Sequence, residues 1–354
     1  MINAVKKIAV YLLCLSFIAL TSCEKAFLEK PVSSDPVSTF EYLWNKVDQQ
    51  YAFFDIKGVN WDSVYDVYRP MVYDDMDDDS LFNVCAAMLN TLRDGHTNLI
   101  SDFDISRNDT VYYKMVAEKN IDTDVVLLNY LTLGYHSTGG FSHYRILEGE
   151  VAYLRFASFE NSISTTTLDY LLDRYKDCRG MILDLRQNGG GLIANIPVLL
   201  SIFDNHGQML YRTQIKSGPG HNDFSEMQTV YADSINYDDL NEPVMIHNYR
   251  KPVAVLIDRG SYSATSFFAI CTMAYDNIKL FGDYTGGGLG LPNGGELPNG
   301  WTYRFSITRT LAIDGNNYEN GVPPDFRVIL DPAYTAQGID NVIEAAADWI
   351  FSEN

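Results

Sequence analysis

The segment Met181-Ile-Leu-Asp-Leu-Arg-Gln-Asn-Gly-Gly-Gly191 sets the fold class of this chain. It begins as a short apolar run, typical of a strand buried in a sheet, and then enters three consecutive glycines. Strand-like apolar runs and helical stretches also alternate before and after this segment in the sequence. Strands are expected at 151–156, 252–257 and 278–282, helices near 168–175, 263–275 and 340–351, and a hairpin turn at Asn299-Gly300. This alternation with an added hairpin predicts an α/β domain.

Residues 38–100 have helical periodicity instead. Ser38-Thr39-Phe40-Glu41 fits a capping box that would open a first helix, and a second helix is expected near Trp61. Apolar residues at helical spacing across 81–92 predict a third. The acidic run 74–79 before it has a calcium-loop interpretation, but the glycine and glutamate of that loop are missing. Acids at the positive end of a helix dipole explain the run better, so we predict a helical N-terminal subdomain without a metal.

The first residues have the pattern of an export signal. Lys6 and Lys7 precede an apolar run at 8–20, which is shorter than the roughly 20 residues of a membrane span. Leu20-Thr21-Ser22-Cys23 then resembles a bacterial lipobox, whose cysteine is acylated. We expect a signal peptide at 1–22, lipidated Cys23, and a tether at 23–37 that anchors the exported protein to the cell envelope. An uncleaved anchor helix is the alternative.

The composition excludes several kinds of partner. Acidic residues number 46 against 26 lysines and arginines, and such a surface repels nucleic acid. Cys85, Cys178 and Cys271 are odd in number and lie far apart in the sequence, which does not fit a disulfide framework. With no Cys/His cluster and no HExxH motif, the sequence predicts neither a zinc site nor another cofactor.

Three segments place reactive groups at the ends of predicted elements. The first holds Asp94-Gly-His-Thr97 and the second is the glycine run of 181–191. The third is Gly260-Ser-Tyr-Ser-Ala264, between a strand and a helix. A serine there is exposed near helix N–H groups, but it needs a base to become a nucleophile. Glycines let backbone N–H groups approach an oxyanion.

Together with Tyr318-Glu-Asn-Gly-Val-Pro-Pro-Asp325, these motifs resemble one superfamily from about Phe40 to the C-terminus. It contains the tail-specific (C-terminal processing) peptidases, the tricorn core protease and retinoid-binding relatives. The resemblance implies a ClpP/crotonase-like core of mixed sheets and helices at 101–354, behind the helical subdomain of 38–100. It also implies a peptide or protein substrate, with cleavage possible near C-termini, and identifies Ser263 as the nucleophile. Ser261 is the alternative serine.

The superfamily has two catalytic solutions. Tail-specific proteases use a lysine about twenty-five residues after the serine, but Gly288 stands at that position and no lysine follows Lys279. Tricorn-like members use a histidine base supported by a glutamate, and the matching positions here are His96 and Glu319. Gly95 replaces the relay serine of tricorn, so Glu319 is expected to reach His96 directly, through Thr97 or through water.

The resemblance also implies oxyanion donors and a substrate surface. The expected donors are the N–H of Ala264 and that of Gly189 or Gly190. The interval 101–149 is too short for a PDZ domain, so substrate capture is expected to involve the helical subdomain and residues 205–240, where His221 is a candidate for the cleft. An ordinary surface loop is the alternative for His221.

Two other functions fit parts of the sequence. Gly189 to Ala194 matches a dinucleotide-binding pattern, but the acidic residue expected about 20 positions later is missing. The second alternative is a non-catalytic binding lipoprotein on the same fold, because fold alone does not define function. Ser263, His96 and Glu319 together in their motifs favour the peptidase.

Overall fold

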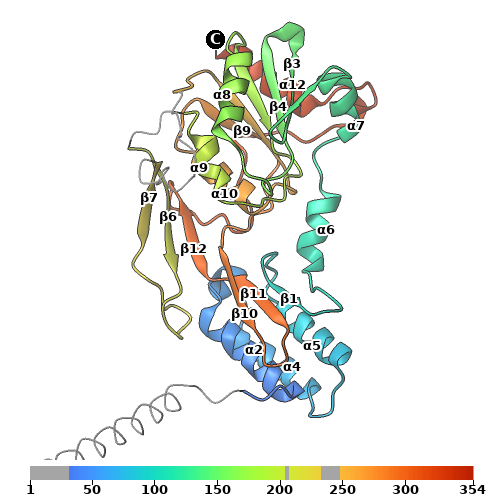
Figure 1. Ribbon diagram of the computed structural model, residues 1–354, viewed down its shortest axis with the longest axis vertical. Coiled ribbons are helices and arrows are strands. Elements are labelled where there is room, and N and C mark those ends of the chain that lie inside the picture. Colours follow the sequence, from blue (N-terminus) through green and yellow to red (C-terminus); the bar gives the residue numbers. More distant parts are fainter. Residues whose placement is uncertain (1–31, 204–206, 233–247, 354) are drawn as a thin grey trace, which may run out of the picture.

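The computed structural model describes residues 32–203, 207–232 and 248–353. The predicted signal peptide, Cys23 and most of the predicted tether lie outside these residues. The described chain forms two lobes, one built on a large sheet and one mainly helical, with helix α6 running between them (Figure 1). Within the described residues, no helix is long and apolar enough to cross a membrane.

A seven-stranded sheet organises the larger lobe, in the order β13-β9-β8-β5-β4-β3-β2. The five strands from β13 to β4 run parallel, and β3 and β2 are antiparallel additions. The strands are β2 (His136–Thr138), β3 (Phe141–Ile146), β4 (Val151–Phe156), β5 (Gly180–Asp184), β8 (Val253–Ile257), β9 (Ile278–Gly282) and β13 (Phe326–Arg327). The predicted strands at 151–156 and 278–282 are confirmed to the residue, and those of β5 and β8 to within one.

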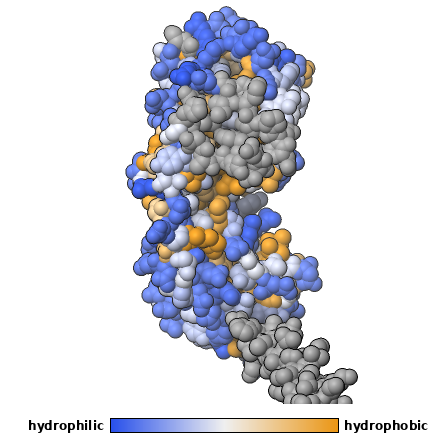
Figure 2. Space-filling model, turned by 60° about the vertical axis from the view of Figure 1, so that its left-hand side comes forward, coloured by the Kyte–Doolittle hydropathy of each residue, from blue (hydrophilic) through white to orange (hydrophobic). Residues whose placement is uncertain are grey.

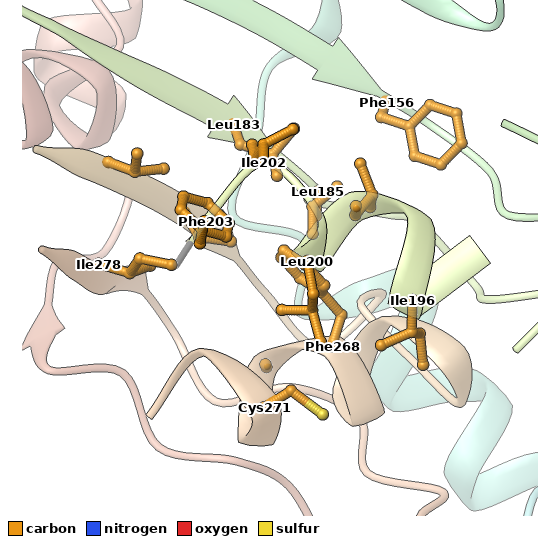
Figure 3. Close-up of a cluster of buried hydrophobic side chains, with 14 of the residues drawn as sticks. Phe156, Leu183, Leu185, Ile196, Leu200, Ile202, Phe203, Phe268, Cys271 and Ile278 are labelled. Atoms are coloured by element: carbon orange, nitrogen blue, oxygen red, sulfur yellow. The ribbon is translucent and has the colours of Figure 1, made fainter. Parts of the chain in front are cut away.

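Both faces of this sheet are covered, which explains why its central strands are almost wholly apolar. On β5, Met181 and Leu183 point into one core, while Ile182 points into the other. The first core packs against the helices α8, α9 and α10, and Figure 3 shows Leu183 beside Ile202 and Leu185 beside Leu200 in it. The second core packs against α12. These helices are α8 (Thr165–Arg174), α9 (Asn195–Leu200), α10 (Ala264–Thr272) and α12 (Asn341–Ser352), and the remaining short ones are α7 (Thr123–Val125), η2 (Val126–Leu131), η3 (Leu147–Gly149) and α11 (Pro332–Thr335).

The smaller lobe contains the predicted N-terminal helices and a sheet from the far end of the chain. Strand β1 pairs with β11, which pairs with β10 in the predicted hairpin. Trp301, Tyr303 and Phe305 of this hairpin lie in the same core as the N-terminal helices. The lobe is therefore not one continuous piece of sequence. Its elements are α2 (Pro36–Gln50), α3 (Phe54–Lys57), α4 (Trp61–Tyr68), η1 (Arg69–Met71), α5 (Asp78–Asn90), β1 (Asn98–Ile100), β10 (Pro292–Glu296) and β11 (Thr302–Ser306), with α6 (Asp109–Ala117) leading away.

One helix start was predicted wrongly. Helix α2 begins at Pro36, and its N-cap is Asp35, whose side chain accepts a hydrogen bond from the Ser38 N–H. The capping box at Ser38 does not form, because Asp35 is a strong N-cap and a proline with a fixed φ follows it. The acidic run behaves as expected of a helix start: Asp77 caps α5, and Asp78 and Asp79 lie in its first turn.

A third sheet lies beside the two lobes. It consists of β12 (Thr308–Ala312), β6 (Met209–Ile215) and β7 (Gln228–Tyr231) in antiparallel order. Only Ile307 separates β11 from β12, so one run of sequence passes from the smaller lobe into this sheet. The three cysteines 85, 178 and 271 are buried free thiols.

Candidate active site

Ser263 lies on a strained turn between β8 and α10. Its φ is 56° and its ψ is −119°, a conformation that costs energy for a residue with a side chain. Two backbone hydrogen bonds hold the turn. The N–H of Ser263 donates to the Gly287 carbonyl at 3.0 Å, and the N–H of Tyr262 donates to the Asn188 carbonyl at 3.0 Å. The loop after β5 and the glycine turn at 285–288 thus fix the position of Ser263 from two sides.

The alternative serine is placed differently. Ser261 is 0% exposed, and its hydroxyl donates to the Leu185 carbonyl at 2.8 Å. It also accepts the N–H of Asp258 at 3.1 Å. Ser261 therefore ties the loop to the sheet and does not line the cavity that contains Ser263.

His96 comes from the other lobe, between α5 and β1. Its Nε2 is 2.9 Å from the Oγ of Ser263, which is hydrogen-bonding distance. The turn that carries it is closed by Asp94, whose Oδ1 accepts the His96 N–H at 2.8 Å. Burial lowers the pKa of His96, while the charge of Asp94 opposes that shift. The imidazole is thus neutral near pH 7 and able to accept a proton from the serine.

Two backbone N–H groups near the serine are free to bind an oxyanion. The N–H of Ala264, at the start of α10, and that of Gly189 donate to no other group within the described residues. Of the two predicted alternatives, Gly189 is the one left free, because the N–H of Gly190 donates to the Asn188 side chain at 3.0 Å. Gly190 is needed for another reason: its φ is +96°, and an added Cβ would lie 2.9 Å from the Cβ of Ser263.

Ser263 and His96 open into a cavity of about 750 Å³ at the junction of the lobes. Arg107 and Arg304 line it together with Glu160, and its apolar lining includes Leu192 and Phe267. Figure 2 shows apolar surface gathered around the narrow middle of the molecule, between the two lobes. The cavity is large enough for several residues of a peptide, with both apolar and charged walls.

His221 does not belong to this cavity, which corrects the prediction that it could line the cleft. Its Nε2 is 2.8 Å from Asp48 Oδ1, and its ring packs on Phe54 with 4.5 Å between centroids. It lines a separate hollow with Trp61 and Arg309 on the smaller lobe. The β6–β7 loop therefore docks on the helices through His221.

Glu319 lies behind the histidine without bonding to it. Its Oε2 accepts the N–H groups of Leu289 at 2.7 Å and Gly290 at 3.1 Å, and its Oε1 is 3.5 Å from Lys57 Nζ. Burial and the nearby Asp94 raise the pKa of Glu319 to about 7, although Lys57 opposes this. The Nδ1 of His96 makes no hydrogen bond of good geometry within the described ranges. Direct support of His96 by Glu319, one of the predicted possibilities, is thus not found.

Three neighbouring residues were not predicted from sequence. Asp94 is the carboxylate that holds the histidine turn, and its place in the motif Asp94-Gly-His-Thr97 was the available signal. Tyr262 packs beside the imidazole, with 5.1 Å between ring centroids. Lys57 pairs with Glu319 from helix α3. No motif surrounds Lys57, so only the fold could reveal it.

A serine on a strained turn, a neutral imidazole at its hydroxyl and free backbone N–H groups beside both form the arrangement of a serine hydrolase. This arrangement is carried by a parallel sheet and glycine loops, which narrow down the class of serine hydrolase. Residues 150–328 match Peptidase family S41, and residues 36–90 match the Tricorn protease C1 domain. The chain belongs to peptidase family S41.

Known proteins agree with this assignment. A solved structure of a candidate peptidase from Parabacteroides merdae is 37% identical, with a TM-score of 0.82 over 91% of this chain and 98% of that one. The photosystem II D1 C-terminal processing protease shares the fold, with a TM-score of 0.53 and 15% identity over 88% of this chain and 97% of that one. The carboxy-terminal processing protease CtpA of Bacillus subtilis is 24% identical over 51% of this chain and 35% of its own length. The chain thus matches about a third of the length of such curated relatives.

Proposed function

We propose that this protein is a serine endopeptidase that cleaves peptides or unfolded exported proteins, including sites near their C-termini. The observation that carries the proposal is the 2.9 Å contact between Ser263 Oγ and His96 Nε2 in the cavity at the lobe junction. Family membership supports it further. The free N–H groups of Ala264 and Gly189 complete the set of groups that acyl transfer requires.

In the proposed reaction, His96 takes the proton of Ser263 as its Oγ attacks the scissile carbonyl carbon. The N–H groups of Ala264 and Gly189 stabilise the oxyanion, aided by the positive end of the helix α10. His96 then donates the proton to the leaving amine, and the C–N bond breaks to leave an acyl-serine. Water, deprotonated by His96, hydrolyses this ester and releases the new carboxyl end. Asp94 holds the imidazole turn in place throughout.

Fluorophosphonate labelling of the purified chain tests the nucleophile. The wild type should be labelled at Ser263, and Ser263→Ala and His96→Ala should abolish labelling while circular dichroism stays unchanged. Ser261→Ala is the matched control, because it removes a hydroxyl two residues away that points into the sheet. Labelling that survives in Ser263→Ala and is lost in Ser261→Ala would reassign the nucleophile. A folded wild type that is never labelled would favour the non-catalytic binding protein.

We further propose that Cys23 carries lipid and tethers the protein to the bacterial cell envelope. The lipobox pattern Leu20-Thr21-Ser22-Cys23 after a short apolar run supports this. Cys23→Ala should move the protein from the membrane to the soluble fraction of cells that express the full chain. Membrane association that persists in this variant would favour an uncleaved helix instead.

A further inference from the structure

A second cavity of about 280 Å³ lies behind the active site and is unusually basic. Lys57, Arg93, Lys114 and Arg259 all line it, and Glu319 is the one carboxylate in its lining. These cations come from four separate parts of the chain. Over the whole sequence, acids outnumber lysines and arginines by 46 to 26, so this concentration of positive charge is the reverse of the overall composition.

The four cations are only partly neutralised by the protein. Arg259 Nε is 3.6 Å from Glu118, and Lys57 Nζ is 3.5 Å from Glu319. Within the described part of the chain, Arg93 and Lys114 form no ion pair with a carboxylate. The side chain of Arg93 instead donates from Nη2 to the Lys57 carbonyl oxygen. Two positive charges therefore face this region without a counter-charge from the described residues.

Three of the four cations, Lys57, Arg93 and Arg259, are held in place by hydrogen bonds to the protein. Lys57 has only 7% of its side chain exposed, and its Nζ donates to Asn320 Oδ1 at 2.8 Å. Arg259 Nη1 donates to the Thr285 carbonyl at 3.1 Å. Arg93 has a φ of 50°, a backbone conformation that residues with side chains adopt rarely and that often marks a functional position.

We propose that this cavity binds a small oxyanion of the phosphate or carboxylate class. Guanidinium groups match the paired oxygens of such anions, and lysines add charge without demanding one geometry. The cavity has room for a polyatomic ion, because its volume of about 280 Å³ far exceeds the roughly 10–15 Å³ that one water molecule needs on the same measure. The ion can be free in solution, or it can be the carboxylate of a bound peptide.

The basic cavity shares a wall with the cavity that contains Ser263. Gly95 and Tyr262 line both cavities, so they form part of the wall between them. Tyr262 directly precedes the nucleophile, and Gly95 precedes His96. A bound anion would also compete with Glu319 for Lys57, which links the site to the carboxylate behind the histidine.

Isothermal titration with inorganic phosphate tests the site directly. The full chain carrying Ser263→Ala is used so that no peptide is hydrolysed, and ionic strength is fixed with chloride to hold general screening constant. We expect one ion per chain with a Kd of about 1 mM or tighter. Lys114→Gln and the pair Arg93→Gln/Lys114→Gln should weaken binding, the pair by at least about tenfold. Lys119→Gln is the matched control, because it removes the same charge from a residue outside the lining and should change Kd less than twofold.

Two peptides identify the source of the anion. If a tripeptide with a free carboxylate displaces phosphate and its C-terminal amide does not, the site takes a substrate carboxylate. If neither does, the natural ligand is a free ion. No phosphate binding, or binding that Lys114→Gln and the control variant weaken equally, would overturn the proposal. Lys114 lies exposed on α6, so its substitution leaves the fold intact. Because the readout is binding, the outcome is independent of whether the chain hydrolyses peptides.

Discussion

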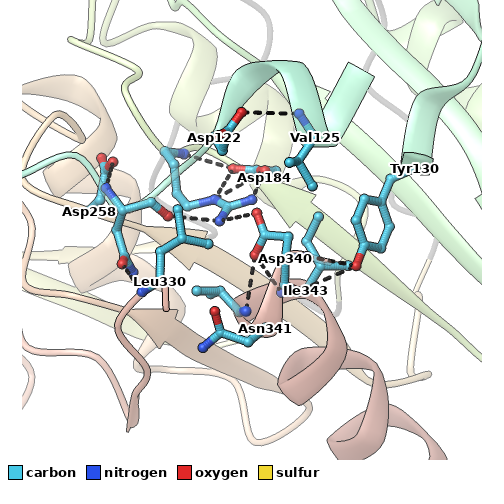
Figure 4. A network of polar contacts seen from close by, with 12 residues as sticks. Asp122, Val125, Tyr130, Asp184, Asp258, Leu330, Asp340, Asn341 and Ile343 are labelled. Atoms are coloured by element: carbon cyan, nitrogen blue, oxygen red, sulfur yellow. Dashed lines mark hydrogen bonds and ion pairs between the residues drawn. The ribbon is translucent and has the colours of Figure 1, made fainter. Parts of the chain in front are cut away.

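Two buried polar regions of this protein are built in opposite ways. At the carboxyl end of β5, the guanidinium of Arg186 bonds to both oxygens of Asp184, to Asp340 at 2.9 Å and to the Asn120 carbonyl at 2.9 Å. Figure 4 shows Asp184 and Asp340 within this network. Tyr153 adds a hydrogen bond to Asp184 at 2.6 Å. Burial raises the pKa of Asp184, but the charges of Arg186 and Arg155, together with hydrogen bonds from Arg186 and Tyr153, outweigh it and keep the pKa below the ordinary value. Every charge in this network is paired.

The region behind His96 leaves polar atoms without partners. Within the described ranges, Tyr51 Oη, Asp94 Oδ2, His96 Nδ1 and Tyr262 Oη are buried and lack a hydrogen bond of good geometry. Unpaired buried polar groups are costly and therefore rare, and they concentrate where function needs them. The comparison teaches that Asp184 and Arg186 stabilise the fold, although they lie in the glycine-rich motif 181–191 that decides the fold class. The polar groups behind His96 are not tied up in such a network and can take part in catalysis.

Breaking the paired network should have the largest effect. Arg186→Met leaves Asp184 buried without its main counter-charge, which should lower the free energy of unfolding by about 3–5 kcal/mol. Urea unfolding followed by circular dichroism measures it. Arg155→Met is the matched control, since Arg155 is 3.5 Å from the same carboxylate and partly exposed, and it should cost much less. Equal losses in both variants would contradict the central role of Arg186.

Glu319→Gln should alter the pH dependence of stability. The pKa of Glu319 is raised to about 7 in the folded protein against an ordinary value of 4.5, mainly by burial. Between these values the folded state holds a proton that the unfolded state has released, so stability falls as pH rises from about 4.5 to about 7. The slope is at most about 1.4 kcal/mol per pH unit. The variant lacks this contribution, so its stability relative to wild type should increase across that window in urea titrations. A constant difference at all pH values would contradict the shift.

Gly95→Ala tests how tightly the unpaired region is packed. An added Cβ would lie 2.6 Å from the Tyr262 hydroxyl, so either the ring or the adjacent His96 must move. A misplaced base should lower kcat/KM at least about tenfold, with little change in folding. Tyr262→Phe removes the closest atom and should restore part of the loss when combined with Gly95→Ala. Equal losses from Gly95→Ala in both backgrounds would show that Tyr262 is not the obstacle.

Arg304→Gln should have the smallest effect. Burial is the main cause of the low pKa of His96, and the positive charge of Arg304 lowers it further. The acid limb of the kcat/KM profile should therefore lie below pH 6.5 in the wild type and move to higher pH in the variant. The profile is measured at fixed ionic strength. A shift to lower pH would contradict this electrostatic picture.

Much of the fold follows from local patterns. Apolar runs placed β4, β5, β8 and β9 within one residue, because strands buried on both faces are nearly all apolar. The starts of helices are less well defined by local sequence. Ser38 and Asp35 both fit an N-cap, and only the structure shows that the Asp35 side chain caps α2. The antiparallel additions at β2 and β3 carried no comparable signal.

The sequence alone determined the family, the helical N-terminal segment, the alternating strands and helices of the core, and which serine and histidine are candidates for the chemistry. These features depend on the local spacing of residues and on motifs that can be recognised in the linear sequence. The tertiary structure alone decided that Ser263 and His96 meet at 2.9 Å across 167 positions of chain. It also decided that the Gly190 N–H donates to the Asn188 side chain and that His221 contacts Asp48 of the smaller lobe. Only the tertiary structure brings four distant cations to one cavity. Contacts between segments far apart in sequence depend on how the two lobes pack, and no local pattern encodes that packing.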